Sequence, residues 1–215
     1  MSDNNEKMKT RILASSGHFL ATNTINAFLP KPLSGAKILY VTTASKKVND
    51  AGYVERTRET MDELNCFYTE YDIVGKSEEE LKKALSSHDI VYVEGGNTFY
   101  LLKAVRETAF EKVVKEAIQN GLVYWGVSAG AYIACPSIIM ATWSDRFDRC
   151  GITDWTAMNL VPFFVKAHYR PDMLETIKEK SKDLQLPLRA LTDEQAVVVR
   201  DGEIQLVGVG DEIVL

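Results

Sequence analysis

Short apolar runs rich in β-branched residues alternate with helical patterns between residues 11 and 127. Near-continuous apolar runs are typical of strands buried on both faces, and intervening helices are the usual connections of a parallel sheet. The partly polar third run is expected near an edge of that sheet. The predicted fold is α/β, a parallel sheet between two helical layers, with strands at 11–16, 37–44, 66–73, 89–96 and 121–127.

Helical spacing of apolar residues predicts a helix over 50–64 and another over 77–85. The second begins after Ser77, a suitable N-cap, and has acidic residues in its first turn. Residues 98–119 are predicted to form two consecutive helices that end at Gly121. These helices fill the connections between the predicted strands.

The pattern changes after residue 136. Residues 136–142 and 159–168 are strand-like, and 170–184 is a predicted helix. The tail is expected to form short strands, with Asp201-Gly202 as a hairpin turn. No linker or low-complexity tract divides the chain, so residues 1–215 are predicted to form a single domain.

Charge and cysteine content narrow the possible partners. The net charge is −5, which does not favour nucleic acid or an anionic membrane as a partner. No apolar stretch reaches the roughly 20 residues of a membrane span, and the N-terminus lacks the apolar core of a secretory signal. The three cysteines fit neither a disulfide framework nor a zinc site. We expect a cytoplasmic protein with reduced thiols and no metal or other cofactor.

One serine stands between two glycines where the fifth predicted strand meets a short helix. Gly126, Ser128 and Gly130 form the Gly-x-Ser-x-Gly pattern of a nucleophile elbow. The helix that follows would direct its N-terminal N–H groups toward the serine oxygen, which favours an oxyanion. A tight turn built from small residues explains the same pattern without catalysis. Whether Ser128 is a nucleophile therefore depends on whether the chain also supplies a base and an acid for it.

A nucleophilic serine needs a base, and the chain has three histidines. Ligands of an open parallel sheet bind at the carboxyl ends of its strands. His88 precedes a predicted strand, and His18 follows the first strand but suits a helix equally well. His168 ends the strand-like run 159–168, so it is the preferred base.

The base in turn needs an orienting acid. Asp145 follows the strand-like run 136–142 and is the preferred candidate, with Asp148 as the alternative. Both also suit a solvated loop with local Asp–Arg pairs. Two backbone donors complete such a site. The N–H of Ala129 follows the nucleophile, and the N–H of Gly96 follows the fourth strand, where the glycine pair also suits a plain tight turn.

Three ordered motifs together resemble peptidase family S51, which holds the aspartyl dipeptidases and the cyanophycinases. They are E-G-G-N-T-F-Y-L-L from residue 94, Y-W-G-V-S-A-G-A-Y-I-A-C-P-S-I from residue 124, and N-L-V-P-F-F-V-K-A-H-Y from residue 159. The resemblance implies a serine peptidase on a flavodoxin-like fold similar to class I glutamine amidotransferases. It implies Ser128 as nucleophile, His168 as base, Gly96 and Ala129 as oxyanion donors, and an acid shortly after the nucleophile helix, where Asp145 lies.

Substrate preference departs from that resemblance. Aspartyl dipeptidases carry a G-E-T-R-E-x-R-like stretch after the histidine, whereas this chain has Y-R-P-D-M-L-E-T-I-K-E-K. Arg170 could replace the missing arginines, as could Arg146 or Arg149. Arg170 and Asn97, which lies in the first motif, are the predicted substrate-binding residues. Without a matched cation an acidic substrate is not expected to be favoured.

The residues leave three functions open. The first is a serine exopeptidase, with short peptides as its substrates. The second is another serine hydrolase such as an esterase, although that fold usually places its histidine later in the chain. The third is a non-catalytic ligand-binding module on the amidotransferase-like fold. The oligomeric state, monomer or homodimer, stays open.

Overall fold

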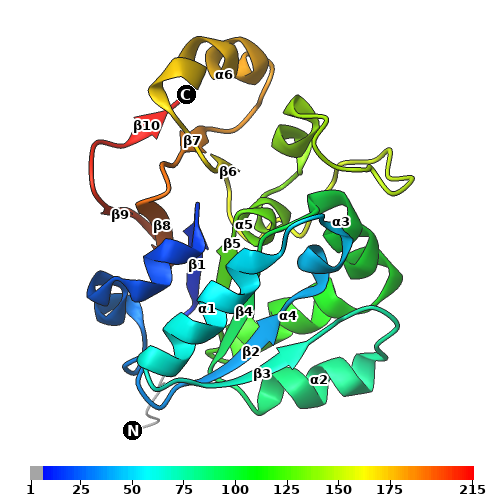
Figure 1. Cartoon of the computed structure of the whole chain (residues 1–215), viewed down its shortest axis with the longest axis vertical. Coiled ribbons are helices and arrows are strands. Elements are labelled where there is room, and N and C mark those ends of the chain that lie inside the picture. The colour runs from blue at the N-terminus through cyan, green and yellow to red at the C-terminus, as the bar shows by residue number, and fades with distance from the viewer. Residues whose placement is uncertain (1–6) are drawn as a thin grey trace, which may run out of the picture.

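The computed structural model describes residues 7–215, apart from the side chain of Asn23. A seven-stranded sheet forms its centre (Figure 1). Its first five strands in spatial order are mutually parallel, and the last two are antiparallel additions. The spatial order is β3 (Phe67–Tyr71), β2 (Lys37–Val41), β4 (Ile90–Val93), β5 (Val123–Val127), β1 (Thr10–Ala14), β8 (Gln195–Arg200) and β9 (Glu203–Gly208).

The five predicted strands are confirmed. β3 lies at an edge of the sheet, as its partly polar sequence predicts, and its residues are largely exposed there. The prediction of a mostly parallel α/β sheet is therefore correct. The hairpin at Asp201-Gly202 is also confirmed, since both residues have positive φ angles, 50° and 93°, between β8 and β9.

Helices cover both faces of the sheet (Figure 1). One face packs against α1 (Gly52–Glu63) and two 3₁₀ helices, η1 (Gly17–Ala21) and η2 (Asn23–Phe28). The larger core on the other face lies beneath α2 (Glu78–Ser86), α3 (Thr98–Glu107), α4 (Phe110–Gln119) and α5 (Ala129–Ala134). The predicted helices are confirmed, and Ser77 caps α2 in a capping box with Glu80.

A second sheet of three strands stands at the carboxyl end of the first (Figure 1). Its parallel strands β6 (Phe164–Lys166) and β7 (Leu188–Ala190) are joined through η5 (Pro171–Met173) and α6 (Leu174–Ser181). The short β10 (Ile213–Val214) pairs antiparallel with β7. This small sheet holds the chain on both sides of His168 and is the part of the fold that completes the site.

One strand prediction is wrong, and another is too long. Residues 136–142 form no strand, because only Ser137 finds a partner, in a single bridge to Thr156, and η4 (Ile139–Trp143) follows. The predicted strand 159–168 is reduced to β6, because Pro162 has no N–H to donate to a ladder. The helix predicted over 170–184 is present but shorter, as η5 and α6.

The described chain has no helix long and apolar enough to cross a lipid bilayer. Of the N-terminal stretch that argues against a secretory signal, residues 1–6 lie outside the described residues. The extent of a single domain over 1–215 stays a prediction.

The turn from β5 to α5 is built on two close backbone approaches. A Cβ on Gly130 would lie 2.1 Å from the carbonyl oxygen of Val93 at the end of β4. A Cβ on Gly126 would lie 2.4 Å from the carbonyl oxygen of Gly130. Between them Ser128 has φ 48° and ψ −102°, a conformation that L-residues rarely adopt. The two glycines therefore let α5 start close to the sheet and turn Ser128 outward.

We expect Gly130→Ala to lower the free energy of unfolding by about 3 kcal/mol or more, because the new methyl group meets backbone that cannot move aside. Gly35→Ala is the matched control. Gly35 has φ 77° but nothing within 4 Å of the position that the new methyl group would take, so this change should cost about 1 kcal/mol of backbone strain. Urea denaturation of both variants checks this, and equal losses would contradict the packing argument.

Candidate active site

The elbow and the second sheet bring Ser128 and His168 together. His168 Nε2 lies 3.0 Å from Ser128 Oγ, which is hydrogen-bond distance. His168 has φ 57°, and this left-handed backbone turns its ring from the end of β6 toward the serine. The backbone of Ser128 is held by its N–H, which donates to the carbonyl of Ala14 at 3.0 Å. An imidazole nitrogen in this position can accept the serine proton.

The acid on His168 is Asp193. Its Oδ1 lies 2.6 Å from His168 Nδ1, a short, charge-assisted type of contact. The expectation that Asp145 orients the histidine is wrong for this geometry. The side chain of Asp145 is 95% exposed and pairs with Arg149, while Asp148 accepts the N–H of Cys150. Neither of these carboxylates pairs with His168, and the strand that was expected to place Asp145 there is replaced by η4.

Pairing within the second sheet positions Asp193. The β6–β7 register continues past the strands, since Leu191 N–H donates to the carbonyl of Lys166 and Tyr169 N–H donates to that of Leu191. Asp193 therefore emerges beside His168. The buried Ser15, at the end of β1, joins the two: its hydroxyl accepts the N–H of His168 at 2.7 Å and donates to Asp193 Oδ1 at 3.2 Å.

The glycine turn after β4 packs on the elbow. A Cβ on Gly95 would lie 3.3 Å from Ser128 Cβ, and one on Gly96, at φ 137°, would lie 2.4 Å from the carbonyl oxygen of Ala44. Only glycine fits at Gly96. Ala129 is the first residue of α5, so its N–H has no acceptor in a preceding helical turn. The glycine turn thus packs against Ser128, and α5 begins at the next residue, so the roles of Gly96 and Ala129 as oxyanion donors stay a prediction.

The two predicted substrate-binding side chains are engaged elsewhere. The buried Asn97 caps α3, accepting from Phe99 N–H at 3.0 Å and from Tyr100 N–H at 3.1 Å, and its amide donates to the carbonyl of Asp148. Arg170 lines the cavity at the site, but its guanidinium pairs with Asp172 through two contacts of 3.2 and 3.3 Å. Its side chain is 70% exposed.

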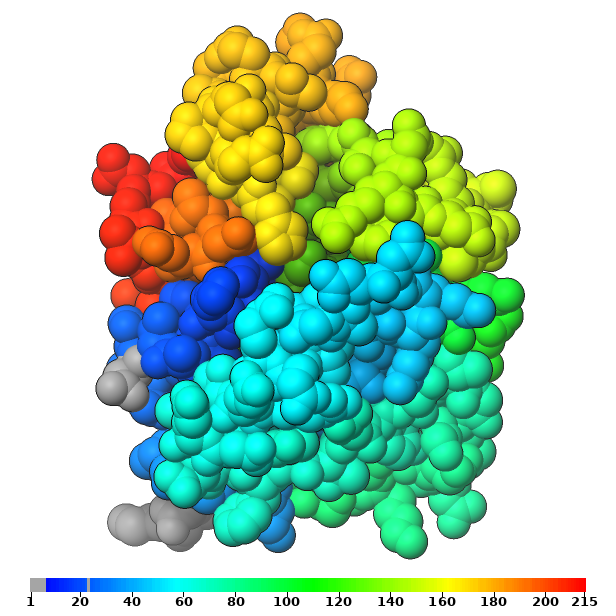
Figure 2. Space-filling view, viewed as in Figure 1, coloured from blue at the N-terminus to red at the C-terminus, as the bar shows by residue number. Residues whose placement is uncertain are grey.

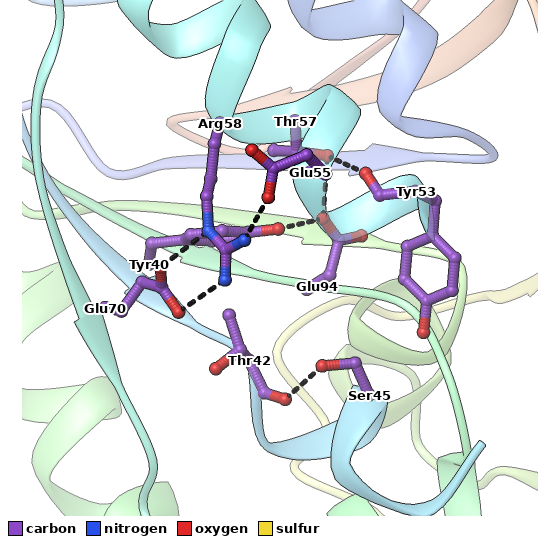
Figure 3. A network of polar contacts seen from close by, with 9 residues as sticks. All are labelled: Tyr40, Thr42, Ser45, Tyr53, Glu55, Thr57, Arg58, Glu70 and Glu94. Carbon is purple, nitrogen blue, oxygen red and sulfur yellow. Dashed lines mark hydrogen bonds and ion pairs between the residues drawn. The ribbon is translucent and has the colours of Figure 1, made fainter. Parts of the chain in front are cut away.

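The fully buried carboxyl group of Glu94, the residue before the glycine turn, holds hydrogen bonds to β2 and α1 (Figure 3). Glu94 accepts from the Tyr40 hydroxyl at 2.6 Å, from the Thr57 hydroxyl at 2.9 Å and from Gly95 N–H at 2.7 Å. The Tyr53 hydroxyl donates to the Gly95 carbonyl at 3.1 Å. Burial raises the pKa of Glu94, and these donors only partly offset the effect. The partial burial of Tyr53 itself, and then the nearby Glu94, raise the pKa of Tyr53 to about 12.

A cavity of about 770 Å³ opens above Ser128 and His168. Its walls come from η1, α1, the glycine turn, η4 and the segment from β6 to α6. In Figure 2 the α6 segment, yellow to orange, stands at the top beside the yellow-green residues around 140–150, with α1 in cyan below. Within residues 7–215, no three of the histidine, cysteine, aspartate and glutamate side chains cluster as metal ligands would.

The comparisons with known proteins agree with this geometry. The model of peptidase family S51 matches residues 12–207, which is most of the chain. The chain belongs to peptidase family S51. It is therefore a serine peptidase of that family, and the resemblance of its three motifs is confirmed.

Individual relatives of this S51 peptidase cover most of its length. An uncharacterized peptidase of Listeria innocua is 31% identical over 176 residues, which are 80% of this chain and 84% of the relative. Peptidase E of Nostoc is 26% identical over 200 residues, 88% and 79% of the two chains. A solved structure from Listeria monocytogenes, named as a candidate peptidase E, has a TM-score of 0.79 at 28% identity and covers 94% of this chain and 100% of its own.

The sequence reasoning missed Asp193 and Ser15 in this S51 peptidase. Ser15 lies near the carboxyl end of the predicted strand 11–16, and Asp193 lies three residues after β7, so the strand-end rule that selected His168 applies to both. The other two histidines take different positions. His18 lines the cavity, and the ring of His88, which precedes β4, contacts the Ala84 carbonyl at 2.7 Å. The three cysteines are free, with Cys66 and Cys135 buried.

We expect Glu94→Gln to change how stability depends on pH. The folded protein binds the Glu94 proton more tightly than the unfolded chain, whose glutamates titrate near pH 4.3. Stability of the wild type should therefore fall, relative to Glu94→Gln, as pH rises from about 4.3 through the raised pKa, and the difference should be constant outside that window. Urea midpoints over a pH series measure this, with the exposed Glu63→Gln as control. A pH-independent difference would contradict the buried-carboxyl argument.

Proposed function

We propose that this S51 peptidase is an exopeptidase of the dipeptidase type that hydrolyses short peptides through Ser128, His168 and Asp193. The observation that carries the proposal is the continuous chain of contacts from Ser128 Oγ to His168 Nε2, 3.0 Å, and from His168 Nδ1 to Asp193 Oδ1, 2.6 Å. Asp193 takes the role first expected of Asp145. No cofactor is needed for this chemistry.

In the first half of the reaction, Ser128 Oγ attacks the peptide carbonyl while His168 Nε2 takes its proton. Asp193 holds Nδ1–H and so keeps the lone pair on Nε2, facing the serine, and it stabilises the imidazolium that forms. The carbonyl oxygen becomes an oxyanion, which the N–H groups of Gly96 and Ala129 would stabilise.

In the second half, His168 returns the proton to the leaving amine, and the acyl group stays on Ser128. A water molecule then gives its proton to His168 and attacks the acyl-serine ester. As the bond from the acyl carbon to Ser128 Oγ breaks, His168 returns the proton to Ser128 Oγ and the acid leaves, so each cycle consumes one water and one peptide bond.

The dimensions and charges of the cavity bear on the substrate. About 770 Å³ suits a small ligand of dipeptide size rather than a folded protein segment. Arg170 is already paired with Asp172, so a cation for an acidic first residue is not supplied there. We propose that acidic first residues are not favoured, as the missing arginine stretch predicts.

Several broader expectations remain proposals. The order β3-β2-β4-β5 corresponds to the 2-1-3-4 order of flavodoxin-like sheets and supports a fold like that of class I glutamine amidotransferases. The free cysteines support a reducing, cytoplasmic location. A short peptide is the proposed partner, and monomer and homodimer remain the alternatives for the assembly.

We expect Ser128→Ala to keep the fold but lower peptide hydrolysis by several orders of magnitude and to abolish labelling by a fluorophosphonate probe. Ser144→Ala, which removes another hydroxyl of the cavity, is the control and should label normally. Rates are measured on Asp-Leu, Glu-Leu, Ala-Leu and Leu-Leu and on simple esters. Turnover of esters without any dipeptide would replace the peptidase proposal by an esterase, and undiminished hydrolysis by Ser128→Ala would remove the serine from the mechanism.

We expect Asp193→Asn to lower kcat for the cleaved dipeptides about a thousandfold or more, because the amide leaves His168 in the wrong tautomer. Asp145→Asn, the same chemical change on an exposed loop, should leave kcat within about twofold. Steady-state kinetics on the three purified proteins decide between them. A larger loss in Asp145→Asn than in Asp193→Asn would restore the original assignment.

A further inference from the structure

Lys166 is a basic side chain in the cavity that the mechanism does not use. It is the last residue of β6, two positions before His168, and it lines the same cavity as Ser128. Its Nζ donates to the carbonyl of Ala167 at 2.8 Å and contacts the hydroxyl of Tyr132 at 3.4 Å. Tyr132 lies one turn of α5 beyond Ser128, so the amine lies between the elbow helix and the strand that carries the base.

This amine lacks a counter-ion among the described residues. No carboxylate in residues 7–215 forms an ion pair with Lys166, and the charged group that shifts its pKa is the positive Arg170. Burial, and then Arg170, lower the pKa of Lys166 to about 8, so the amine is still mostly protonated at neutral pH. A partly buried ammonium without a carboxylate is a ready site for an anionic ligand.

The other basic side chains of the cavity wall are differently placed. They are exposed, and two of them have partners: Arg170 pairs with Asp172, and Lys180 donates to the carbonyl of Trp143 at 3.2 Å. Lys166 is the partly buried one in this set, which comprises Arg56, Arg146, Lys166, Arg170 and Lys180. An anion bound at Lys166 would therefore gain more from desolvation than one at the rim.

The position of Lys166 relative to His168 indicates which part of a substrate it meets. His168 must protonate the leaving amine, so the leaving residue lies against the end of β6. In that residue the carboxylate carbon is about 2.5 Å from the nitrogen. With a hydrogen bond of about 3 Å at each end, the span is up to about 8 Å. Lys166 and His168 are two positions apart and line the same cavity as Ser128, so one leaving residue of this span can contact both side chains.

On the basis of the proposed function, we infer that Lys166 binds the free α-carboxylate of the leaving residue, so that the enzyme selects peptides whose scissile bond precedes the last residue. This makes a dipeptide the smallest complete substrate. It also provides a reason for exopeptidase action that depends on neither the identity of the first residue nor the exposed Arg170.

The wild-type protein tests this with each dipeptide that it cleaves and the same peptide carrying a C-terminal amide, with Ala-Leu and Asp-Leu as the reference pair. We expect kcat/KM to be at least about tenfold higher for the free acid, whatever the first residue, because the amide cannot neutralise Lys166. Equal values for acid and amide would overturn the inference and leave the proposed function intact. Turnover of no dipeptide and no amide would overturn the proposed function and the inference with it.

Variants locate the effect. Lys166→Met, of similar length but neutral, should lower kcat/KM for the free acid to the value for the amide, while the amide changes less than about threefold. Lys166→Arg should retain most of the preference, which keeps the test valid if the Met variant does not fold. Lys180→Met, the same change on an exposed wall residue, should keep the acid-to-amide ratio of the wild type.

Two outcomes in the variants would overturn the inference. If Lys166→Met lowers acid and amide equally, Lys166 supports the structure of the site rather than the substrate carboxylate. If the loss follows Asp-Leu and its amide but not Ala-Leu, the amine binds the side chain of the first residue instead.

Discussion

The contact between the start of α5 and the end of β4 is the constraint on which the site depends. Because Gly130 lets its backbone approach the Val93 carbonyl, α5 can begin close to the carboxyl ends of β4 and β5. Ser128 is thereby held at φ 48° and half-buried at that end of the sheet, beside the glycine turn that follows β4. Strain at the serine is compensated by dense packing on both sides, where Gly126 leaves no room for a Cβ and Gly95 leaves little. Ser128 and the proposed oxyanion donors Gly96 and Ala129 therefore lie around the same close contact.

His168 and Asp193 lie beside a separate sheet, and one buried hydroxyl, that of Ser15, links both of them to the main sheet. Parallel pairing of β6 with β7 sets His168 and Asp193 side by side, although 25 positions separate them in the chain. Ser15, at the end of β1, then ties this pair to the main sheet that carries Ser128. The alignment of serine, histidine and aspartate therefore depends on how the two sheets dock at the carboxyl ends of the strands.

The ionisable groups of the site differ in how far they are buried. Glu94 lies fully buried below the glycine turn, where its hydrogen bonds hold Gly95 in place, and burial favours its neutral form. Lys166 lies at intermediate depth in the cavity wall and has hydrogen bonds but no carboxylate among the described residues. The exposed rim holds ion pairs such as Arg170 with Asp172, which contribute little because water screens them. The proposed binding of a substrate carboxylate at Lys166 would therefore move that carboxylate from the screened rim to a partly buried, poorly screened charge.

Local pattern was enough for the core of the fold and for half of the site. Apolar runs and helical spacing determine the five parallel strands and their helices, because burial on both faces leaves little choice of residue. The Gly-x-Ser-x-Gly turn identifies Ser128, and the strand-end rule identifies His168, because both follow from backbone geometry within a few residues. The acid was decided only by the tertiary structure. Asp145 and Asp193 both follow apolar runs. The run before Asp193 forms β7, which pairs with β6, whereas the run before Asp145 becomes η4, since only Ser137 finds a partner there. Neither segment alone shows which distant segment it pairs with. The sequence by itself therefore predicts Ser128 and His168 as the candidate nucleophile and base, whereas the tertiary structure decides that Asp193 contacts His168 and where Lys166 lies.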